Sequence, residues 1–239
     1  MNVLVNGSTG FVGTWMRKTL PNNVWAMGVG HQDYLDWEWE LFNWDAIVHL
    51  APISPSRVLA YAKEHKTRVL FASSGAVYEG QGKYADDKRA WEKECQDSGV
   101  DCVVARLFAT SGLPFQKNKA LSIFIQAALK DEPLEVWGNG RTVRSYLYGE
   151  DVGRAFWEIL LNGNGTYDVG STVPFSMLQV AELVQYYIPY SRSKIKFVKH
   201  KEMPTPVYYV PKSIDPLVCK ETVNLYGTIE RMVKNEKNI

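Results

Sequence analysis

The chain has 239 residues, of which 46% are hydrophobic and 13% aromatic, a composition typical of a folded globular protein. Its 27 lysines and arginines nearly balance its 26 aspartates and glutamates, so no basic surface for nucleic acid is expected. No apolar run approaches the ~20 residues of a membrane-spanning helix, and the first residues already have the pattern of a strand rather than of a signal peptide. Three cysteines, an odd number without metal-binding spacing, suit a reducing compartment. We therefore expect a cytoplasmic protein that binds no nucleic acid, membrane or metal.

The first twenty residues have the pattern of a strand, a glycine-rich turn and a helix. Residues 3–5 predict a buried strand, apolar residues recur at helical spacing before Pro21, and the turn between them is Gly7-Ser8-Thr9-Gly10-Phe11-Val12-Gly13. Glycines in such a turn let a pyrophosphate approach the backbone, and the helix N-terminus supplies N–H donors and positive potential. The pattern predicts a dinucleotide-binding loop whose contacts to the cofactor come from Gly7, Thr9, Gly10, Phe11, Val12 and Gly13.

The rest of the chain alternates between predicted strands and helices, which favours a parallel, doubly wound α/β sheet. The expected strands are 24–29, 47–51, 68–72 and 101–107. The expected helices are 57–65, 84–97, 121–129, 151–161 and one that begins at Ser176, where Ser176-x-x-Gln179 has the pattern of a capping box. We expect residues 1–111 to form a dinucleotide-binding core and residues 112–239 to form a small substrate-binding lobe interleaved with it.

A serine, a tyrosine and a lysine stand where they could form a catalytic site. Ser74 follows the strand at 68–72, and Tyr84 and Lys88 are four residues apart in the next helix. Residues i and i+4 lie on one helix face, so the phenol and the ammonium can meet. A nearby cation lowers the pKa of a phenol from about 10, which makes tyrosine an acid and base nearer to neutral pH. The alternative is an ordinary amphipathic helix, because Tyr-x-x-x-Lys occurs often by chance.

Together these motifs resemble the extended short-chain dehydrogenase/reductase family, in particular its nucleotide-sugar epimerase and dehydratase branch. Residues 45–51 are similar to the family's strand beside the nicotinamide half of the cofactor, and residues 134–152 are similar to its sugar-nucleotide segment. The resemblance implies a Rossmann-type fold and a nucleoside-diphosphate sugar as partner. It also implies that Leu50, Ala51 and Lys88 contact a nicotinamide cofactor, and that Ser74 and Arg144 bind the substrate.

Arg144 has two interpretations. A guanidinium can grip a diphosphate through two hydrogen bonds, as the resemblance implies. The alternative is a surface arginine paired with Glu150 or Asp151, and such pairs contribute little.

The chain departs from the family after its second strand. The segment before residue 47 is too short for the usual helix, strand and helix, so we expect residues 34–36 to be the remnant of the third strand, with Asp36 near the adenine. We expect Trp37, Trp39 and Trp44 to cover the shortened sheet rather than to form a partner surface. The second strand ends without an acid for a ribose 2′-OH, and no base for a 2′-phosphate follows. We therefore expect NAD on the strength of the resemblance, while NADP is not excluded.

The two residues after Ser74 indicate which type of reaction the protein can catalyse. Relatives that dehydrate hexoses usually carry Asp-Glu there, whereas this chain has Gly75 and Ala76, which cannot donate a proton. Epimerisation through a keto-sugar needs only Ser74, Tyr84, Lys88 and the nicotinamide, so it is the expected activity. An NADPH-dependent keto-sugar reductase and a non-catalytic NAD(P)-binding protein stay open as alternatives.

The helix expected at 84–97, which carries Tyr84, also bears on whether the protein forms a dimer. Relatives commonly dimerise through this helix, but Trp91 and Cys95 share the face of Tyr84 and Lys88, so we expect both to pack inward. A homodimer is therefore an open expectation.

Overall fold

Six parallel strands form the central sheet of the computed structural model, which describes residues 1–30, 38–199 and 208–237. Each neighbouring pair in this sheet is parallel. In spatial order the strands are β2 (Trp25–Val29), β1 (Asn2–Asn6), β3 (Ala46–His49), β4 (Arg68–Ser74), β5 (Cys102–Leu107) and β9 (Thr166–Val169).

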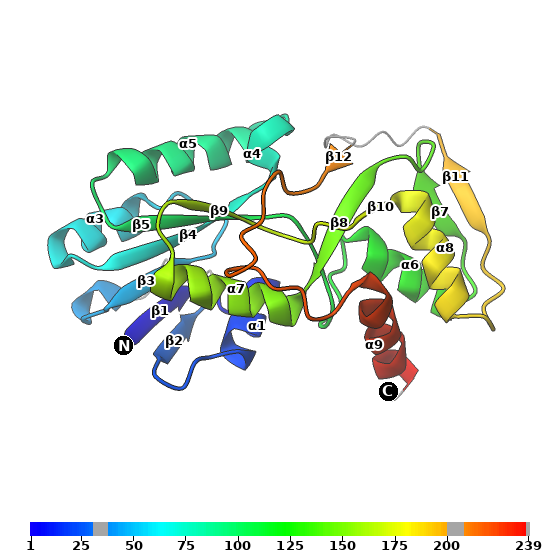
Figure 1. The fold of residues 1–239 in the computed structure, drawn as a ribbon, viewed down its shortest axis with the longest axis horizontal. Coiled ribbons are helices and arrows are strands. Elements are labelled where there is room, and N and C mark those ends of the chain that lie inside the picture. Colours follow the sequence, from blue (N-terminus) through cyan, green and yellow to red (C-terminus); the bar gives the residue numbers. More distant parts are fainter. Residues whose placement is uncertain (31–37, 200–207, 238–239) are drawn as a thin grey trace.

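Helices cover both faces of the sheet (Figure 1). Those on one face are α1 (Phe11–Lys18) and α7 (Gly149–Asn162), and those on the other are α3 (Ser56–His65), the short α4 (Ala76–Glu79) and α5 (Lys83–Asp97). Strand β1 shows how the sequence specifies a sheet covered on both faces, because alternate residues of a strand point to opposite faces. Val3 and Val5 pack in the cluster with α1 and α7, whereas Leu4 packs in the cluster with α3. The expected Rossmann-type, doubly wound sheet is confirmed.

Two glycines bring α7 directly against α1. A Cβ on Gly149 would lie 2.0 Å from the indole nitrogen of Trp15, and a Cβ on Gly153 would lie 2.7 Å from the carbonyl oxygen of Trp15. One turn further along α7, the indole of Trp157 donates to the carbonyl of Met16 at 2.8 Å. The helix that carries the glycine-rich loop is therefore fixed by contacts from the second half of the chain.

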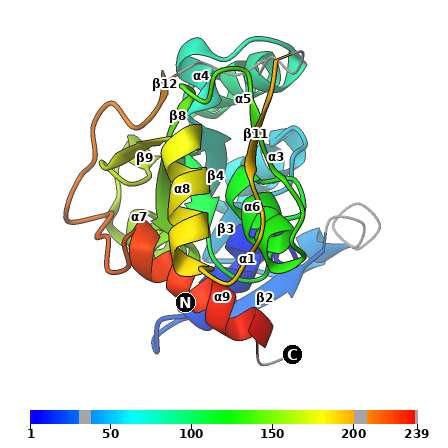
Figure 2. The same cartoon turned by 90° about the vertical axis from the view of Figure 1, so that its right-hand side faces the viewer.

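A smaller lobe stands at the carboxyl ends of the central strands, to the right in Figure 1 and toward the viewer in Figure 2. Its strands are β6 (Ala109–Ser111), β7 (Leu134–Trp137), β8 (Val143–Tyr148), β10 (Pro174–Ser176), β11 (Ile195–Val198) and β12 (Tyr208–Tyr209), and its helices are α6 (Ala120–Leu129), α8 (Met177–Tyr187) and α9 (Leu225–Lys237). The predicted capping box at the start of α8 is confirmed: Ser176 accepts from the Gln179 backbone, and the Gln179 side chain accepts from the Ser176 backbone.

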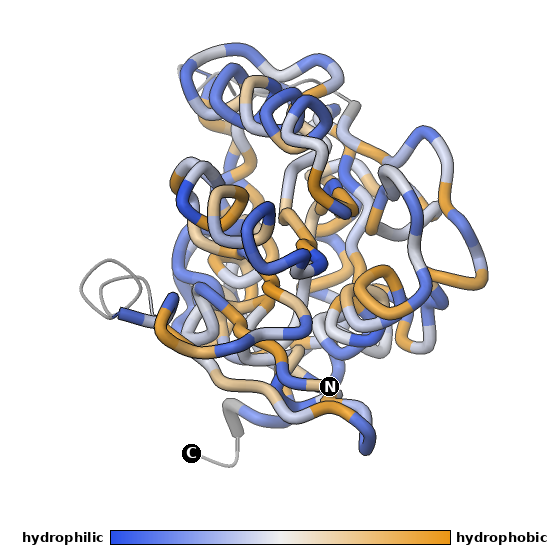
Figure 3. The backbone as a smooth tube through the Cα atoms, turned by 90° about the vertical axis from the view of Figure 1, so that its left-hand side faces the viewer, coloured by the Kyte–Doolittle hydropathy of each residue, from blue (hydrophilic) through white to orange (hydrophobic). Residues whose placement is uncertain are grey.

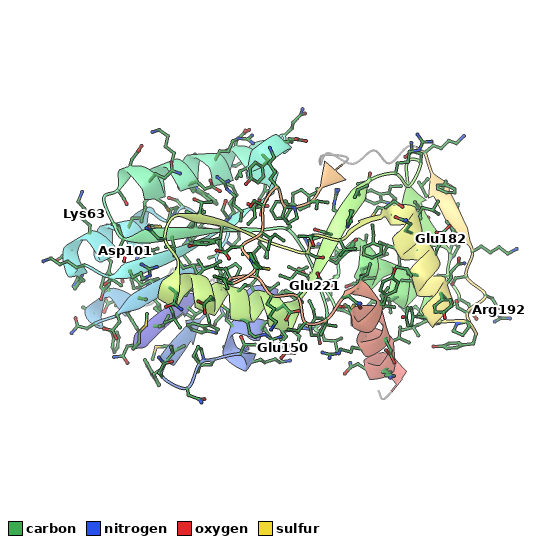
Figure 4. All side chains as sticks on the ribbon, viewed as in Figure 1. Lys63, Asp101, Glu150, Glu182, Arg192 and Glu221 are labelled. Carbon is green, nitrogen blue, oxygen red and sulfur yellow. The ribbon has the colours of Figure 1, made fainter. Side chains whose placement is uncertain are left out.

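The chain crosses between the two parts more than once. After β8, α7 and β9 return to the central sheet, so that sheet contains chain from both of the expected regions. The segment between β12 and α9, orange in Figure 1, runs along the junction of the two parts. The buried Asp151 of α7 holds this segment by accepting hydrogen bonds from the backbone N–H groups of Thr222 and Val223. Glu221, which lies beside α7 in Figure 4, accepts a hydrogen bond from the hydroxyl of Ser171.

The shortened region between β2 and β3 is covered by aromatic side chains. Trp39, in the 3₁₀ helix η1 (Trp39–Leu41), is fully buried, and Trp44 is 6% exposed in the same cluster. The expected cover is confirmed for these two residues, whereas Trp37 and the strand remnant at 34–36 lie outside the described residues. Along the tube of Figure 3, hydrophobic residues gather in the central strands and hydrophilic ones on α5, at the top of the view. None of the helices in the described part of the chain has the length and apolar character needed to cross a bilayer.

Candidate active site

The carboxyl ends of β1, β3, β4 and β5 open into a cavity of about 520 Å³ that the smaller lobe closes on its far side. Within the sheet, β2 lies next to β1 toward one edge, whereas β3 and then β4 follow toward the other edge. The cavity therefore lies at the point where strand order reverses, which is where ligands bind in open α/β sheets.

The glycine-rich turn forms one wall of this cavity. Gly7 has φ +79, which a residue with a side chain rarely adopts, and its N–H is held by the carbonyl of Val29 at 2.8 Å. Gly10 precedes α1 without a side-chain cap on the helix, so the N–H groups of the first turn are left for an anion. A Cβ on Gly10 would have only the carbonyl of Gly7, at 3.3 Å, within 4 Å, whereas a Cβ on Gly13 would lie 2.4 Å from the Cα of Ser8. The turn thus has the shape expected of a pyrophosphate-binding loop, with Gly10 open toward the cavity and Gly13 packed against the turn itself.

Most of the expected cofactor contacts line the cavity. Gly7, Gly10, Phe11, Val12, Gly13, Leu50 and Lys88 do so. Thr9 is exposed at the tip of the turn and Ala51 is buried behind Leu50, and neither is in the cavity wall. Asp36 lies outside the described residues.

Ser74, Tyr84 and Lys88 also line this cavity, although they come from two elements. Ser74 ends β4 and is 5% exposed, while Tyr84 lies in the first turn of α5 and is 56% exposed. The buried Lys88 sits one turn further along α5, and its ammonium donates to the carbonyl of Ala72 at 2.7 Å. The structure therefore brings together the three residues that the spacing predicted, and their roles stay predictions.

Lys88 is a charged group in an apolar setting. Its ammonium lies 4.8 Å from the ring centre of Phe71 and 5.1 Å from that of Trp91. Burial lowers the pKa of Lys88 to about 8, and the carboxylate of Glu92 opposes this fall. The lysine is therefore still mainly a cation at neutral pH, close to the point at which it can give up its proton.

An ion pair supports the helix that carries these residues. Glu92, 5% exposed and one turn after Lys88, accepts from Arg106 of β5 at 2.6 Å and from Ser73 at 2.5 Å. This pair raises the pKa of Arg106 above its ordinary value. Ser73 belongs to β4 and Arg106 to β5. Their bonds to Glu92 therefore fix the rotation of α5 about its axis, with the face of Lys88 toward the cavity. The neighbouring Trp91 and Cys95 pack into the core beneath it, as expected.

The lobe contributes a positively charged end to the cavity. Arg144 of β8 is 8% exposed and lies over the ring of Tyr209, with 5.2 Å between the guanidinium carbon and the ring centre. Glu150 and Asp151 pair with Arg154 instead, so the alternative of a surface pair for Arg144 is wrong. Burial lowers the pKa of Arg144, as it must where a cation is removed from water.

Lys119 and Tyr209 are among the residues of this cavity that were not predicted from the sequence. Lys119 precedes α6 in the cavity wall, and burial together with the charge of Arg144 lowers its pKa. Tyr209 of β12 reaches Ser74, with 2.9 Å between the two hydroxyl oxygens. A lysine just before a predicted helix is a weak signal for Lys119, and no local pattern marks Tyr209.

His49 has a structural role. It is fully buried at the end of β3, its Nδ1 lies 2.9 Å from the side-chain amide of Asn6, and its Nε2 lies 3.1 Å from the carbonyl of Ile53. An Nε2–H tautomer that accepts from Asn6 satisfies both contacts. The ring thus ties β1 to β3 below the glycine-rich turn.

A family model described as the NAD dependent epimerase/dehydratase family matches residues 44–170. UDP-glucuronic acid decarboxylase 1 of Arabidopsis thaliana is 24% identical over 213 residues, which cover 76% of this chain and 48% of the relative. An uncharacterized UDP-glucose epimerase of Bacillus subtilis, YtcB, is 28% identical over 151 residues, which cover 54% of this chain and 48% of the relative. The chain thus matches about half the length of these curated relatives.

Solved structures share the fold over the whole chain. A UDP-glucose 4-epimerase of Thermotoga maritima, solved with UDP-glucose, has a TM-score of 0.83 at 18% identity and covers 100% of this chain and 99% of its own. A UDP-glucuronic acid 4-epimerase of Bacillus cereus, solved with UDP-glucuronic acid and NAD, has a TM-score of 0.84 at 17% identity, with the same coverage. At these identities the likeness establishes the fold.

Proposed function

The chain belongs to the NAD-dependent epimerase/dehydratase family, and from that premise we propose that it is a nucleotide-sugar epimerase that oxidises its sugar transiently to a keto-sugar. One observation carries the proposal: Ser74, Tyr84, Lys88 and Arg144 come from three separate elements and line a single cavity with the glycine-rich turn. A fold of this kind does not require such a convergence, because fold alone does not specify chemistry.

The two ends of the cavity suit the two molecules of the reaction. The glycine-rich turn and the first turn of α1 would hold the pyrophosphate of NAD, which when bound supplies a hydride acceptor. At the other end, the buried Arg144 and the more exposed Lys119 are two cations that would bind the substrate diphosphate. The anion would offset the repulsion between these two like charges, so its affinity should depend on both.

Between these ends the chain's own residues would move the proton. Tyr84 would take the proton of the sugar hydroxyl while Ser74 hydrogen-bonds the same oxygen. The ammonium of Lys88, in the wall of the same cavity, would contact the nicotinamide cofactor beside Tyr84. After the keto-sugar turns over in the cavity, Tyr84 would return the proton to the new hydroxyl. Tyr84 lines the cavity and is 56% exposed, which leaves room for a substrate beside it.

The residue after the serine supports epimerisation over dehydration. A Cβ on Gly75 would lie 2.5 Å from the ring of Phe108, so an acidic side chain there would have to displace that ring. Decarboxylation deserves a direct test because UDP-glucuronic acid decarboxylases are among the relatives. Oxidation of UDP-glucuronic acid at C4 would give a β-keto acid, which could lose CO₂ from the same intermediate that an epimerase would reduce.

A panel of nucleotide sugars tests the proposal. The protein would be incubated with UDP-glucose, UDP-glucuronic acid and UDP-N-acetylglucosamine, with and without added NAD or NADPH, and the products read by NMR. An epimer formed without net consumption of cofactor is the expected result. UDP-xylose would show a decarboxylase, and consumption of NADPH a reductase. Binding of NAD and UDP with no conversion of any sugar would leave the non-catalytic alternative.

Two tyrosine-to-phenylalanine variants test whether the conversion depends on Tyr84. Tyr84→Phe should remove the conversion, whereas Tyr186→Phe, at a tyrosine of α8 that is 75% exposed, should not. Equal loss in both variants would contradict the assignment of Tyr84. A homodimer stays a prediction, and sedimentation of a monomer at micromolar concentration would remove it.

A further inference from the structure

Tyr209 joins the two ends of the cavity through one side chain. Its hydroxyl lies 2.9 Å from the hydroxyl of Ser74, across 135 residues of sequence, and its ring lies under the guanidinium of Arg144. The ring also packs on Phe108, with 5.0 Å between ring centres. Tyr209 therefore touches the residue expected at the reacting oxygen and the residue expected at the diphosphate.

The hydrogen bonds of Ser74 show what its contact with Tyr209 can do. A hydroxyl has one proton and two lone pairs. Ser74 already accepts from the backbone N–H of Ala76 at 3.2 Å. If Tyr209 donates to Ser74, both lone pairs of the serine are used, and its proton is left to point into the cavity.

The opposite direction is less favourable. If Ser74 donated to Tyr209, the phenol would have to donate to the carbonyl of Leu107, at the longer distance of 3.3 Å. That carbonyl already accepts from the N–H of Gly75 at 3.1 Å, so it does not need the phenol as a donor. Ser74 would then have no proton for a substrate oxygen.

We propose that Tyr209 is a positioning residue for catalysis, whose hydroxyl donates to Ser74 and so directs the serine proton toward the reacting oxygen of the sugar. The proposal rests on the function proposed above. It adds a residue from the C-terminal segment to the catalytic and substrate-binding side chains proposed on β4, α5 and β8.

The backbone, not the phenol, holds Tyr209 in place. Strand β12 pairs with β8, where Tyr209 lies opposite Arg144. Three residues later the N–H of Lys212 donates to the carboxylate of Asp168 at 3.1 Å. Further along, Asp151 anchors Thr222. Removing the hydroxyl alone should therefore leave the ring, its packing on Phe108 and its contact with Arg144 unchanged.

Kinetics of Tyr209→Phe test the role. We expect kcat to fall roughly tenfold, the order expected when one neutral hydrogen bond is lost, with UDP affinity unchanged by calorimetry. In a Ser74→Ala background, Tyr209→Phe should cause no further loss, because a residue that acts through Ser74 has nothing left to position. Tyr186→Phe serves as the control. A wild-type kcat in Tyr209→Phe, or losses that multiply in the double variant, would overturn the proposal.

A second measurement does not need turnover. In protein labelled with ¹³C at the tyrosine Cζ, the resonance that disappears in Tyr209→Phe reports the hydrogen bonds of this phenol. Ser74→Ala should shift that resonance, and an unmoved resonance would overturn the proposal. If the wild type converts no nucleotide sugar, the proposed function fails, while this measurement still decides whether Tyr209 holds Ser74.

Discussion

Replacing Lys88 by methionine should make the protein more stable and inactive at once. Lys88 is 4% exposed, and its pKa falls from the ordinary 10.5 to about 8 because burial disfavours the charged form. A difference of about 2.5 pH units, at 1.36 kcal/mol per unit, means that the charged lysine costs the folded state about 3 kcal/mol. Lys88→Met removes this cost and keeps the apolar stem, but it loses the hydrogen bond to Ala72, worth about 1 kcal/mol. The free energy of unfolding at pH 7 should therefore rise by about 2 kcal/mol.

The gain in stability from Lys88→Met should become smaller as the pH rises. Below pH 8 both the folded and the unfolded chain hold the proton, so the cost of the buried charge is fully present. Between pH 8 and 10.5 the unfolded chain binds more protons than the folded one, so the wild type gains stability as the pH rises. The advantage of Lys88→Met should therefore shrink across this window.

Denaturation by urea, followed by tryptophan fluorescence at pH 7 and pH 10, measures the effect. Cofactor-free protein is required, because a bound ligand adds its own stabilisation. Lys93→Met is the control on the same helix, since the Lys93 side chain is 74% exposed and its pair with Asp97 contributes little. Its change should stay within about 0.5 kcal/mol. A Lys88→Met variant less stable than the wild type at pH 7, or with the same gain at both pH values, would refute the reasoning.

Three further predictions concern the cavity. Tyr84→Phe should lower kcat by roughly 10²–10⁴ without changing the melting temperature, and a wild-type kcat would show that Tyr84 is not the acid and base. Gly10→Val should lose NAD affinity by calorimetry while the protein stays folded; Gly13→Val should unfold it, because the new Cβ would lie 2.4 Å from the Cα of Ser8. Equal effects of the two changes on folding would contradict this division. Arg144→Ala should weaken UDP binding by about 1.5–3 kcal/mol and spare NAD binding, and unchanged UDP affinity would move the diphosphate elsewhere.

Local patterns in the sequence were sufficient for much of the fold and for the two motifs. The glycine-rich turn, the alternation of strands and helices and the capping box at Ser176 each depend on residues close together in the chain, and each is where it was expected. The pairing of Tyr84 with Lys88 on one helix face is equally local. The inward packing of Cys95 follows from the same helical period.

Tertiary structure alone decided which charges are buried and which distant side chains meet. Helical spacing places Lys88 on a face, but the pKa of about 8 comes from strand β4 and the rings around it. Arg144 looks like an ordinary surface cation in the sequence, but the folded lobe buries it and places Lys119 in the wall of the same cavity. Tyr209 comes from a two-residue strand, whose pairing with β8 has no local signal, because its partner lies more than sixty residues earlier in the sequence. Contacts of this kind depend on packing across the whole chain, so they appear only when the lobe is built.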